Sequence, residues 1–232
     1  MRGRISLLVL ASIAALVLGT VAAASTSHAS KTTRTAQRLY NTTDQALARS
    51  IVLKGQDIGP RSTWSGGLSA PSTSAPRTCA NFHATQSDLV ITGDSQSDYA
   101  MANGVTYHDE AQVMQTSRMV KLDWQRNVAN PAALTCLKTF LAKSLPSGEH
   151  LVSLMRLSVP RIATYAIGYR ALIDQQAAGG QTVRTMLDVM FVGRNRTELT
   201  LETSAPYASH VATMQSELRL AHLLVARTPA HS

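Results

Sequence analysis

Four consecutive segments with the pattern of β-strands, joined by short links, constrain the fold of this chain more than any other feature. The segments are 151–159, 162–173, 182–192 and 197–203. In the third, mostly β-branched or aromatic residues at every second position form one face, which is typical of a strand. Links this short join antiparallel neighbours, because a parallel pair needs a crossover of about a dozen residues or more. The sequence therefore predicts an antiparallel sheet.

Helices are predicted in blocks before and after these strands rather than between them. Helical spacing of apolar residues predicts the helices and β-branched runs predict two earlier strands. The expected helices are 43–54, 116–128, 131–145 and 207–227, and the earlier strands are 89–92 and 105–115. The order α-β-β-α-α-β-β-β-β-α indicates an α+β fold. We expect one domain with a twisted antiparallel sheet of about six strands and helices packed on it.

The amino terminus has the three parts of an export signal. Arg2 and Arg4 precede an apolar run at 5–18, and small residues follow at 19–24. This pattern predicts a signal peptide. Residues 5–24 are also long enough to cross a bilayer, so residues 1–24 are expected to be either a cleaved signal or an N-terminal membrane anchor. Both alternatives place the rest of the chain outside the cytoplasm, extracellular or at the cell surface.

Composition divides the remaining chain into three parts. Residues 25–42 carry few strongly apolar side chains and are expected to form a disordered stalk. The α+β domain is expected to cover 43–227, and 228–232 to form a tail. The segment 65–78 contains two Gly, two Pro and four Ser and is expected to be a loop.

The chain has two cysteines, Cys79 and Cys136. An exported protein reaches an oxidising compartment, so we expect them to form a structural disulfide. Two free buried thiols are the alternative. A redox role is not supported, because the chain has no Cys-x-x-Cys motif.

The formal net charge of +8 is spread along the chain, and Lys and Arg never occur three in a row. Proteins that bind nucleic acids usually cluster such residues. The charge therefore indicates diffuse solvation or contact with anionic envelope components, and no nucleic-acid partner is expected. No cofactor is expected either, and the ligand or cell-envelope partner is unknown.

One segment bears on catalysis. Gly93-Asp94-Ser95 resembles the first block of GDSL-type hydrolases, in which a strand leads into a turn that carries the nucleophile. That resemblance implies a secreted serine hydrolase as the alternative function. The late Asp-x-x-His of that family, which supplies the base, is missing here. A polar turn within a strand pair explains the segment as well, so no catalytic residue is assigned.

A metal site is not expected. His108 and Glu110 share one face of a predicted strand, but nothing at a useful spacing completes the ligand set that a metal needs. Trp64 and Trp124 are the candidate pocket residues. In a chain with few large rings, packing in the core or in a pocket wall is expected of both before direct stacking on a ligand.

Several short motifs resemble those of uncharacterised exported proteins of high-GC Gram-positive bacteria. They comprise Asp44–Arg49, Leu53, Asp57–Pro60, Trp64, Cys79, Gly93 with Ser97, Trp124 and Cys136-Leu137. The order of elements also resembles the PsbP-like fold and, more distantly, the external sensor domains of PknH-type kinases. Such sensor domains usually carry a second disulfide, for which this chain has no cysteines. The resemblance implies an exported, non-catalytic binding or sensor-like domain at the cell surface.

Overall fold

The computed structural model describes residues 35–71, 78–79, 82–83, 86–177 and 180–230. The expected signal or anchor and most of the expected stalk lie outside these residues. None of the helices in the described part of the chain combines the length and apolar character needed to cross a membrane.

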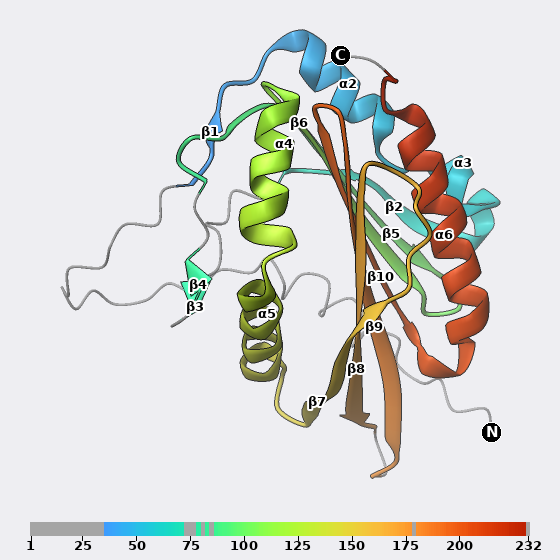
Figure 1. Ribbon diagram of the computed structural model, residues 1–232. Coiled ribbons are helices and arrows are strands. Elements are labelled where there is room, and N and C mark those ends of the chain that lie inside the picture. The colour runs from blue at the N-terminus through green and yellow to red at the C-terminus, as the bar shows by residue number, and fades with distance from the viewer. Residues whose placement is uncertain (1–34, 72–77, 80–81, 84–85, 178–179, 231–232) are drawn as a thin grey trace.

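A large mixed sheet forms the centre of the molecule (Figure 1). Its strands follow the order β1-β5-β6-β10-β9-β8-β7, and β2 also pairs with β5, which makes eight strands within the described residues. All neighbouring strands are antiparallel except the short β1, which pairs with β5 in parallel. The strands are β1 (Gln37–Arg38), β2 (Trp64–Ser69), β5 (Val90–Met101), β6 (Thr106–Met114), β7 (Glu149–Leu157), β8 (Tyr165–Gln176), β9 (Thr182–Arg194) and β10 (Thr197–Pro206). A separate pair consists of β3 (Thr78–Cys79) and β4 (Phe82–His83).

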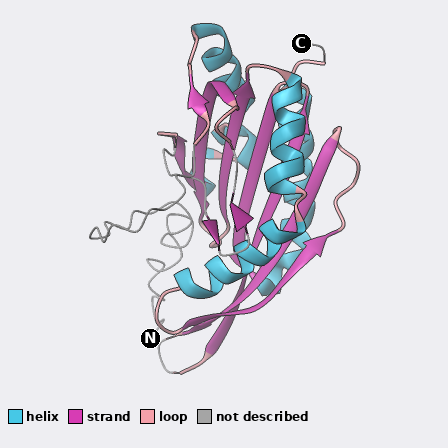
Figure 2. Cartoon of the chain, turned by 60° about the vertical axis from the view of Figure 1, so that its left-hand side comes forward, coloured by secondary structure: helices cyan, strands magenta, loops and turns pink. Residues whose placement is uncertain are grey.

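Helices cover both faces of the sheet (Figure 1 and Figure 2). On one face lie α2 (Thr42–Ile51), α3 (Gly55–Ile58) and α6 (His210–Arg227). On the other lie α4 (Ser117–Asp123), a π-helical turn η2 (Trp124–Val128) and α5 (Pro131–Ser144). Two 3₁₀ turns, η1 (Arg61–Thr63) and η3 (Tyr207–Ser209), precede β2 and α6.

The helix boundaries follow from local sequence. The Asn41 side chain accepts a hydrogen bond from the backbone N–H of Asp44 at the start of α2. Thr116 caps α4 in the same way. Asn130 caps α5, and Pro131 occupies its first position. These residue types satisfy backbone N–H groups that have no partner inside the helix.

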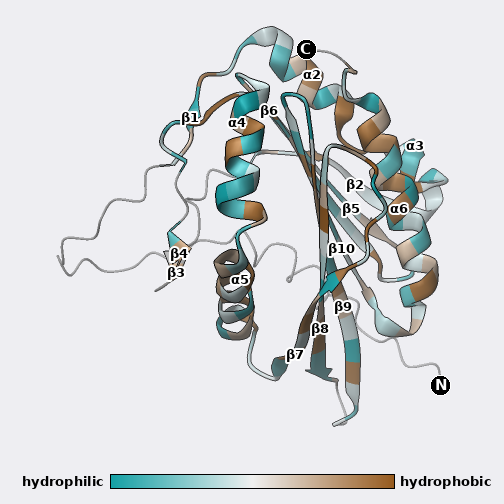
Figure 3. Cartoon of the chain, in the orientation of Figure 1, coloured by the Kyte–Doolittle hydropathy of each residue, from teal (hydrophilic) through white to brown (hydrophobic). Residues whose placement is uncertain are grey.

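The main core lies between the sheet and the helices α2 and α6. Leu199 and Leu201 on β10 pack there with Leu220 and Leu224 of α6. Hydrophobic residues recur along α6 and the strands of the sheet (Figure 3). A smaller cluster packs around Leu141 of α5 on the other face. The sheet therefore has one largely apolar face and one face with a smaller apolar cluster.

The expected α+β fold is confirmed, and the helices lie on a sheet that is antiparallel apart from β1. The expected number of about six strands is wrong, because β1 and β2 extend the sheet beside β5. The segment read as a loop from residue 65 begins as strand β2. The strand expected at 89–92 continues to Met101, with a register shift between Ile91 and Gly93 that lets the polar residues after it stay in the strand.

The expected ends of the domain also differ from the structure. Gln37 and Arg38 lie in the segment expected to be disordered, yet they pair with β5. Thr228 is buried, although it begins the expected tail. The carbonyl oxygens of Pro229 and Ala230 accept hydrogen bonds from the side chain of Asn195. Hydrogen bonding of the backbone, which composition does not reveal, holds both ends on the domain.

Candidate functional site

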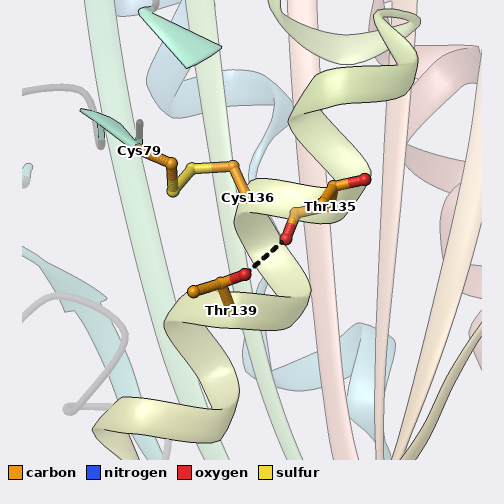
Figure 4. Close-up of a disulfide and its surroundings, with 4 residues drawn as sticks. All are labelled: Cys79, Thr135, Cys136 and Thr139. Atoms are coloured by element: carbon orange, nitrogen blue, oxygen red, sulfur yellow. Dashed lines mark hydrogen bonds between the residues drawn. A yellow bond between two sulfur atoms is a disulfide. The ribbon is translucent and has the colours of Figure 1, made fainter. Parts of the chain in front are cut away.

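The disulfide between Cys79 and Cys136 is confirmed, with Cα atoms 5.6 Å apart. It joins the short strand β3 to α5 (Figure 4). Cys136 is buried, and β4 also contacts α5. The disulfide thus holds the β3–β4 pair against the helical layer that covers one face of the sheet.

That face is polar where it is formed by β5, β6 and β10. Cross-strand partners place polar residues side by side in rows. The rows are Asp94–Gln112–Glu198, Gln96–Glu110–Thr200 and Asp98–His108–Glu202. Directly paired residues project from the same face of a sheet, so these side chains form one continuous polar surface. Asp94, Gln96 and His108 are buried although they are polar.

Two adjoining cavities lie between this face and the helices α4, η2 and α5. The smaller has a volume of about 120 Å³ and a lining that is about equally polar and apolar, with the polar residues Glu110, Gln112, Asp123, Glu198 and Thr200 beside apolar ones that include Trp124. The larger, of about 310 Å³, is mainly apolar and is lined by residues that include Phe82, Leu134, Leu137, Phe140 and Tyr169. Asp123, Val128 and Phe191 border both cavities, which therefore form one cleft.

The π-helical turn η2 shapes the roof of this cleft. The N–H of Ala129 donates to the carbonyl of Trp124, five residues earlier, at 2.8 Å. π-Helical turns are rare and occur frequently at functional sites. Trp124 stacks on Tyr165, with ring centroids 5.2 Å apart. Asp123 accepts hydrogen bonds from Asn127 at 2.6 Å and from Gln86 at 3.2 Å.

The carboxyl groups of the cleft are held in an unfavourable environment for charge. Glu198 Oε1 is shielded from solvent and has no hydrogen-bond partner among the described residues. Burial, and then the negative charges of Asp123 and Glu110, raise the pKa of Glu198 well above its usual value. Burial also raises the pKa of Asp123, although its two amide donors oppose this effect. Burial and the acidic neighbours therefore favour the neutral form of Glu198 over the ionised form.

Two further ionisable groups lie on the same polar face. Burial, and then the charge of Glu110, raise the pKa of Asp94 to about 7, despite the ion pair with Arg38 at 2.5 Å. Burial opposes a charge on His108. Its hydrogen bond to Asp98 at 2.6 Å and the carboxyl groups of Glu202 and Glu110 outweigh that effect and raise the pKa of His108 to about 9.

The paired imidazole of His108 is positively charged at neutral pH and is a poor metal ligand in that state. Among the residues that the structure describes, no group of three or more His, Cys, Asp or Glu side chains is arranged to hold a metal ion.

The structure places Ser95 of the GDSL-like segment on the face of the sheet opposite the cleft. Ser95 lies inside strand β5, where it pairs with Ala111 and is buried. Ala111 belongs to the core beside α6, on the opposite face of the sheet from the cleft. A hydrolase of the GDSL type presents its serine on an exposed turn after a strand, whereas β5 continues to Met101. This geometry gives the serine hydrolase alternative no support.

The two candidate pocket residues lie in different environments. Trp124 lines the smaller cavity. Trp64 instead packs against the main core, edge-to-face with Tyr99 and with the guanidinium of Arg61 4.2 Å from its ring centroid. Its indole N–H donates to the carbonyl of Gly59 at 3.0 Å. The structure does not bring the two tryptophans together in either of the cavities described above.

Sequence reasoning does not identify Asp123 or Glu198 as site residues. Glu198, Thr200 and Glu202 alternate with the apolar Leu199 and Leu201, which is the usual pattern of a strand with one face in water. The helices that cover this face come from a distant part of the sequence. A run of acidic residues on a strand whose other face is apolar is the only local signal of the cleft.

Comparisons with known proteins give distant structural neighbours. No family model and no curated protein matches the chain. The extracellular domain of PknH from Mycobacterium tuberculosis aligns over 77% of this chain and 95% of its own, with 9% identity and a TM-score of 0.46. A putative uncharacterized protein, the Rv0999 ortholog from Mycobacterium smegmatis, aligns over 79% and 97%, with 11% identity and a TM-score of 0.41.

A third neighbour is LpqN of Mycobacterium tuberculosis, a protein involved in cell envelope biogenesis. It aligns over 72% of this chain and 77% of its own, with 10% identity and a TM-score of 0.28. The neighbours thus include the extracellular domain of PknH, and the order of helices and strands expected from the sequence resembles domains of this type. With all three TM-scores below 0.5, these likenesses carry no conclusion about the ligand or activity of this chain.

Proposed function

We propose that this chain is an exported, non-catalytic domain that binds a small ligand at the cell surface, in the cleft between the polar sheet face and the helices α4, η2 and α5. The observation that carries this proposal is the pair of adjoining cavities, of about 120 and 310 Å³, the first lined by polar and apolar residues alike and the second mainly apolar. Ligand sites in proteins are typically concave, mainly apolar and provided with a few placed polar groups.

Two features support a location outside the cytoplasm. The amino terminus has the pattern of an export signal, and the single disulfide joins the β3–β4 pair to the roof of the cleft. Disulfides persist mainly in oxidising compartments. Mass spectrometry of the mature protein tests this part of the proposal. A new amino terminus at Ser25 or Ser30 indicates a cleaved signal, retention of Met1 indicates an anchor, and a reduced Cys79 would contradict export.

A non-catalytic role agrees with the chemistry of the cleft. Its polar groups are carboxyl, amide and hydroxyl side chains, which bind and orient a ligand through hydrogen bonds. Ser95, the candidate nucleophile from the sequence, lies on the other face of the sheet. Nucleophilic catalysis by serine needs an adjacent base and donors for the developing oxyanion, and within the described residues no hydrogen bond joins the Ser95 side chain to a base.

The proposal is tested with Nile red, a neutral apolar dye that becomes fluorescent on leaving water. We expect saturable binding by the purified protein. The substitution Ala133→Trp places a large ring in the wall of the larger cavity and is expected to weaken dye binding at least about tenfold. Lys138→Trp, on an exposed position of the same helix, is the matched control and is expected to bind like the wild type.

Equal binding by the wild type and Ala133→Trp, or no binding by the wild type, would refute the cleft as a ligand site. If tryptophan prevents folding, Ala133→Leu fills less of the cavity and provides the same comparison. Circular dichroism of each variant establishes that the fold is retained before dye binding is compared.

A further inference from the structure

Three carboxyl groups from three different elements meet at the smaller cavity. Glu110 comes from β6, Glu198 from the neighbouring β10 and Asp123 from the end of α4 above them. In the sheet, Glu110 pairs directly with Thr200, which is two residues along β10 from Glu198 and on the same face. The negative charges of Asp123 and Glu110 both act on Glu198, and like charges in one partly buried site repel one another.

The hydrogen bonds around these groups are unequal. Asp123 accepts from Asn127 and Gln86, and Glu110 accepts from the amide of Gln112 at 2.6 Å. Glu198 Oε1 is shielded from solvent and has no such donor among the described residues. A buried carboxyl oxygen that accepts no hydrogen bond is costly. Glu198 Oε1 is therefore an acceptor to which a ligand in the cavity can donate a hydrogen bond.

The chain supplies no cation to the cavity from the residues that line it. Its lining contains no Lys, Arg or His. Arg126, which follows Trp124 in η2, forms an ion pair with Asp88 at 2.7 Å near the exposed surface. Trp124 and Phe191 add two aromatic rings to the lining, and aromatic rings attract cations. The negative charge, the missing hydrogen-bond donor and the aromatic rings all favour a positively charged group that donates hydrogen bonds.

We propose that the smaller cavity is a subsite for the ammonium head of an amphiphilic amine, whose alkyl chain occupies the adjoining apolar cavity. The ammonium group donates to Glu198 Oε1 and neutralises part of the charge of Glu110 and Asp123. A volume of about 120 Å³ admits a compact head group. This inference rests on the proposed function, because it assigns a ligand class to the same cleft.

The arrangement of the two cavities fixes the orientation of such a ligand. Phe191 and Val128 border both cavities. An alkyl chain that extends from the smaller cavity into the larger one therefore passes between these two apolar side chains. Leu134, Leu137 and Phe140 of the larger cavity then cover the alkyl chain. Burial of the chain provides the non-directional part of the affinity, and the carboxyl groups provide selectivity for the positive head.

Binding of the amine is also linked to protons. The groups that face Glu198 are Glu110 on β6 and Asp123 on α4, both acidic, and they favour its neutral form. A bound ammonium favours the ionised form instead. Binding of the amine therefore lowers the pKa of Glu198, and we expect the affinity to increase with pH until this group is ionised in the free protein.

The test compares decylamine, decanol and decanoate, which have the same chain length and a positive, neutral or negative head. Isothermal titration of the full-length protein at neutral pH is expected to give at least tenfold tighter binding of decylamine than of the other two. Glu198→Gln is expected to weaken decylamine binding about tenfold or more and to leave decanol binding unchanged. Glu149→Gln, on β7 and outside both cavities, is the matched control.

Each outcome separates this inference from the proposed function. If decanol and Nile red bind but decylamine has no advantage, or if Glu198→Gln has no effect, the ammonium subsite is refuted and the cleft remains a ligand site. If none of the probes binds, the proposed function is refuted as well. Should Glu198→Gln fail to fold, Glu110→Gln changes the same cavity and is expected to weaken decylamine binding selectively.

Discussion

The buried carboxyl group of Glu217 offers a sharp test of the electrostatics of the core. Glu217 lies on α6 and is fully buried, and both of its carboxyl oxygens lack a hydrogen-bond partner within the described residues. It faces the ion pair in which Arg170 Nε donates to Asp188 at 2.7 Å. Burial, and then the negative charge of Asp188, raise the pKa of Glu217 from 4.5 to about 9.

The raised pKa of Glu217 makes the stability of the protein depend on pH. A group whose pKa is raised in the folded state binds a proton more tightly there than in the unfolded chain. Its contribution is complete below the unfolded pKa of 4.5 and is lost as pH rises through about 9. One pKa unit corresponds to slightly more than 1 kcal/mol. Glu217 alone should therefore lower the free energy of unfolding by roughly 4 kcal/mol between about pH 5 and about pH 8.

The substitution Glu217→Gln isolates this contribution, because glutamine has the shape of the protonated acid and does not titrate. Urea unfolding followed by circular dichroism, at a series of pH values, gives the free energy of unfolding for both proteins. The difference between variant and wild type cancels the effects of other titrating groups, such as Asp109 and Asp94. We expect the variant to gain slightly more than 1 kcal/mol relative to the wild type per pH unit across this range. Parallel curves would refute the reasoning.

Three further predictions follow from other parts of the structure. Replacing Cys79 and Cys136 by serine should lower the free energy of unfolding by about 4 kcal/mol, as expected for a crosslink spanning 57 positions, and an unchanged urea midpoint would contradict this. Gly93→Ala should destabilise the protein by about 1–3 kcal/mol, since a Cβ there would lie 2.2 Å from the carbonyl oxygen of Asp44; unchanged thermal unfolding would argue against this packing. Ser95 should not react with a fluorophosphonate probe, because it is buried in β5; stoichiometric labelling that Ser95→Ala abolishes would restore the hydrolase hypothesis.

The strands and long helices are largely predictable because their patterns are local. The helix expected at 131–145 corresponds to α5, which begins at Pro131 and ends at Ser144, because proline and the preceding asparagine specify its start. The four strands expected between 151 and 203 all occur, in antiparallel pairs. Short links and alternation determine this part of the fold without information from elsewhere in the chain.

Elements that depend on distant partners are not predictable in the same way. Trp64–Ser69 contains two glycines and two serines, and it is a strand only because β5 offers an edge for pairing. Gln37 and Arg38 likewise become ordered through β5 and the ion pair with Asp94. Composition indicates flexible segments at both places, and tertiary hydrogen bonds override that tendency.

The cleft is the least predictable feature. Glu198 is separated by more than seventy positions from Asp123 in the sequence, and nothing local indicates that they meet. The alternation around Glu198 is the usual signature of a solvent-facing side chain. Only the packing of α4 and the π-helical turn over this face converts a polar strand surface into a partly covered cleft.

The most direct test of this account is a crystal structure of the protein grown with decylamine. In that structure we expect the ammonium nitrogen at about 3 Å from Glu198 Oε1, with the alkyl chain beside Phe191 in the larger cavity. Decylamine on the α6 face of the sheet, or a cleft that stays empty at saturating decylamine, would contradict it.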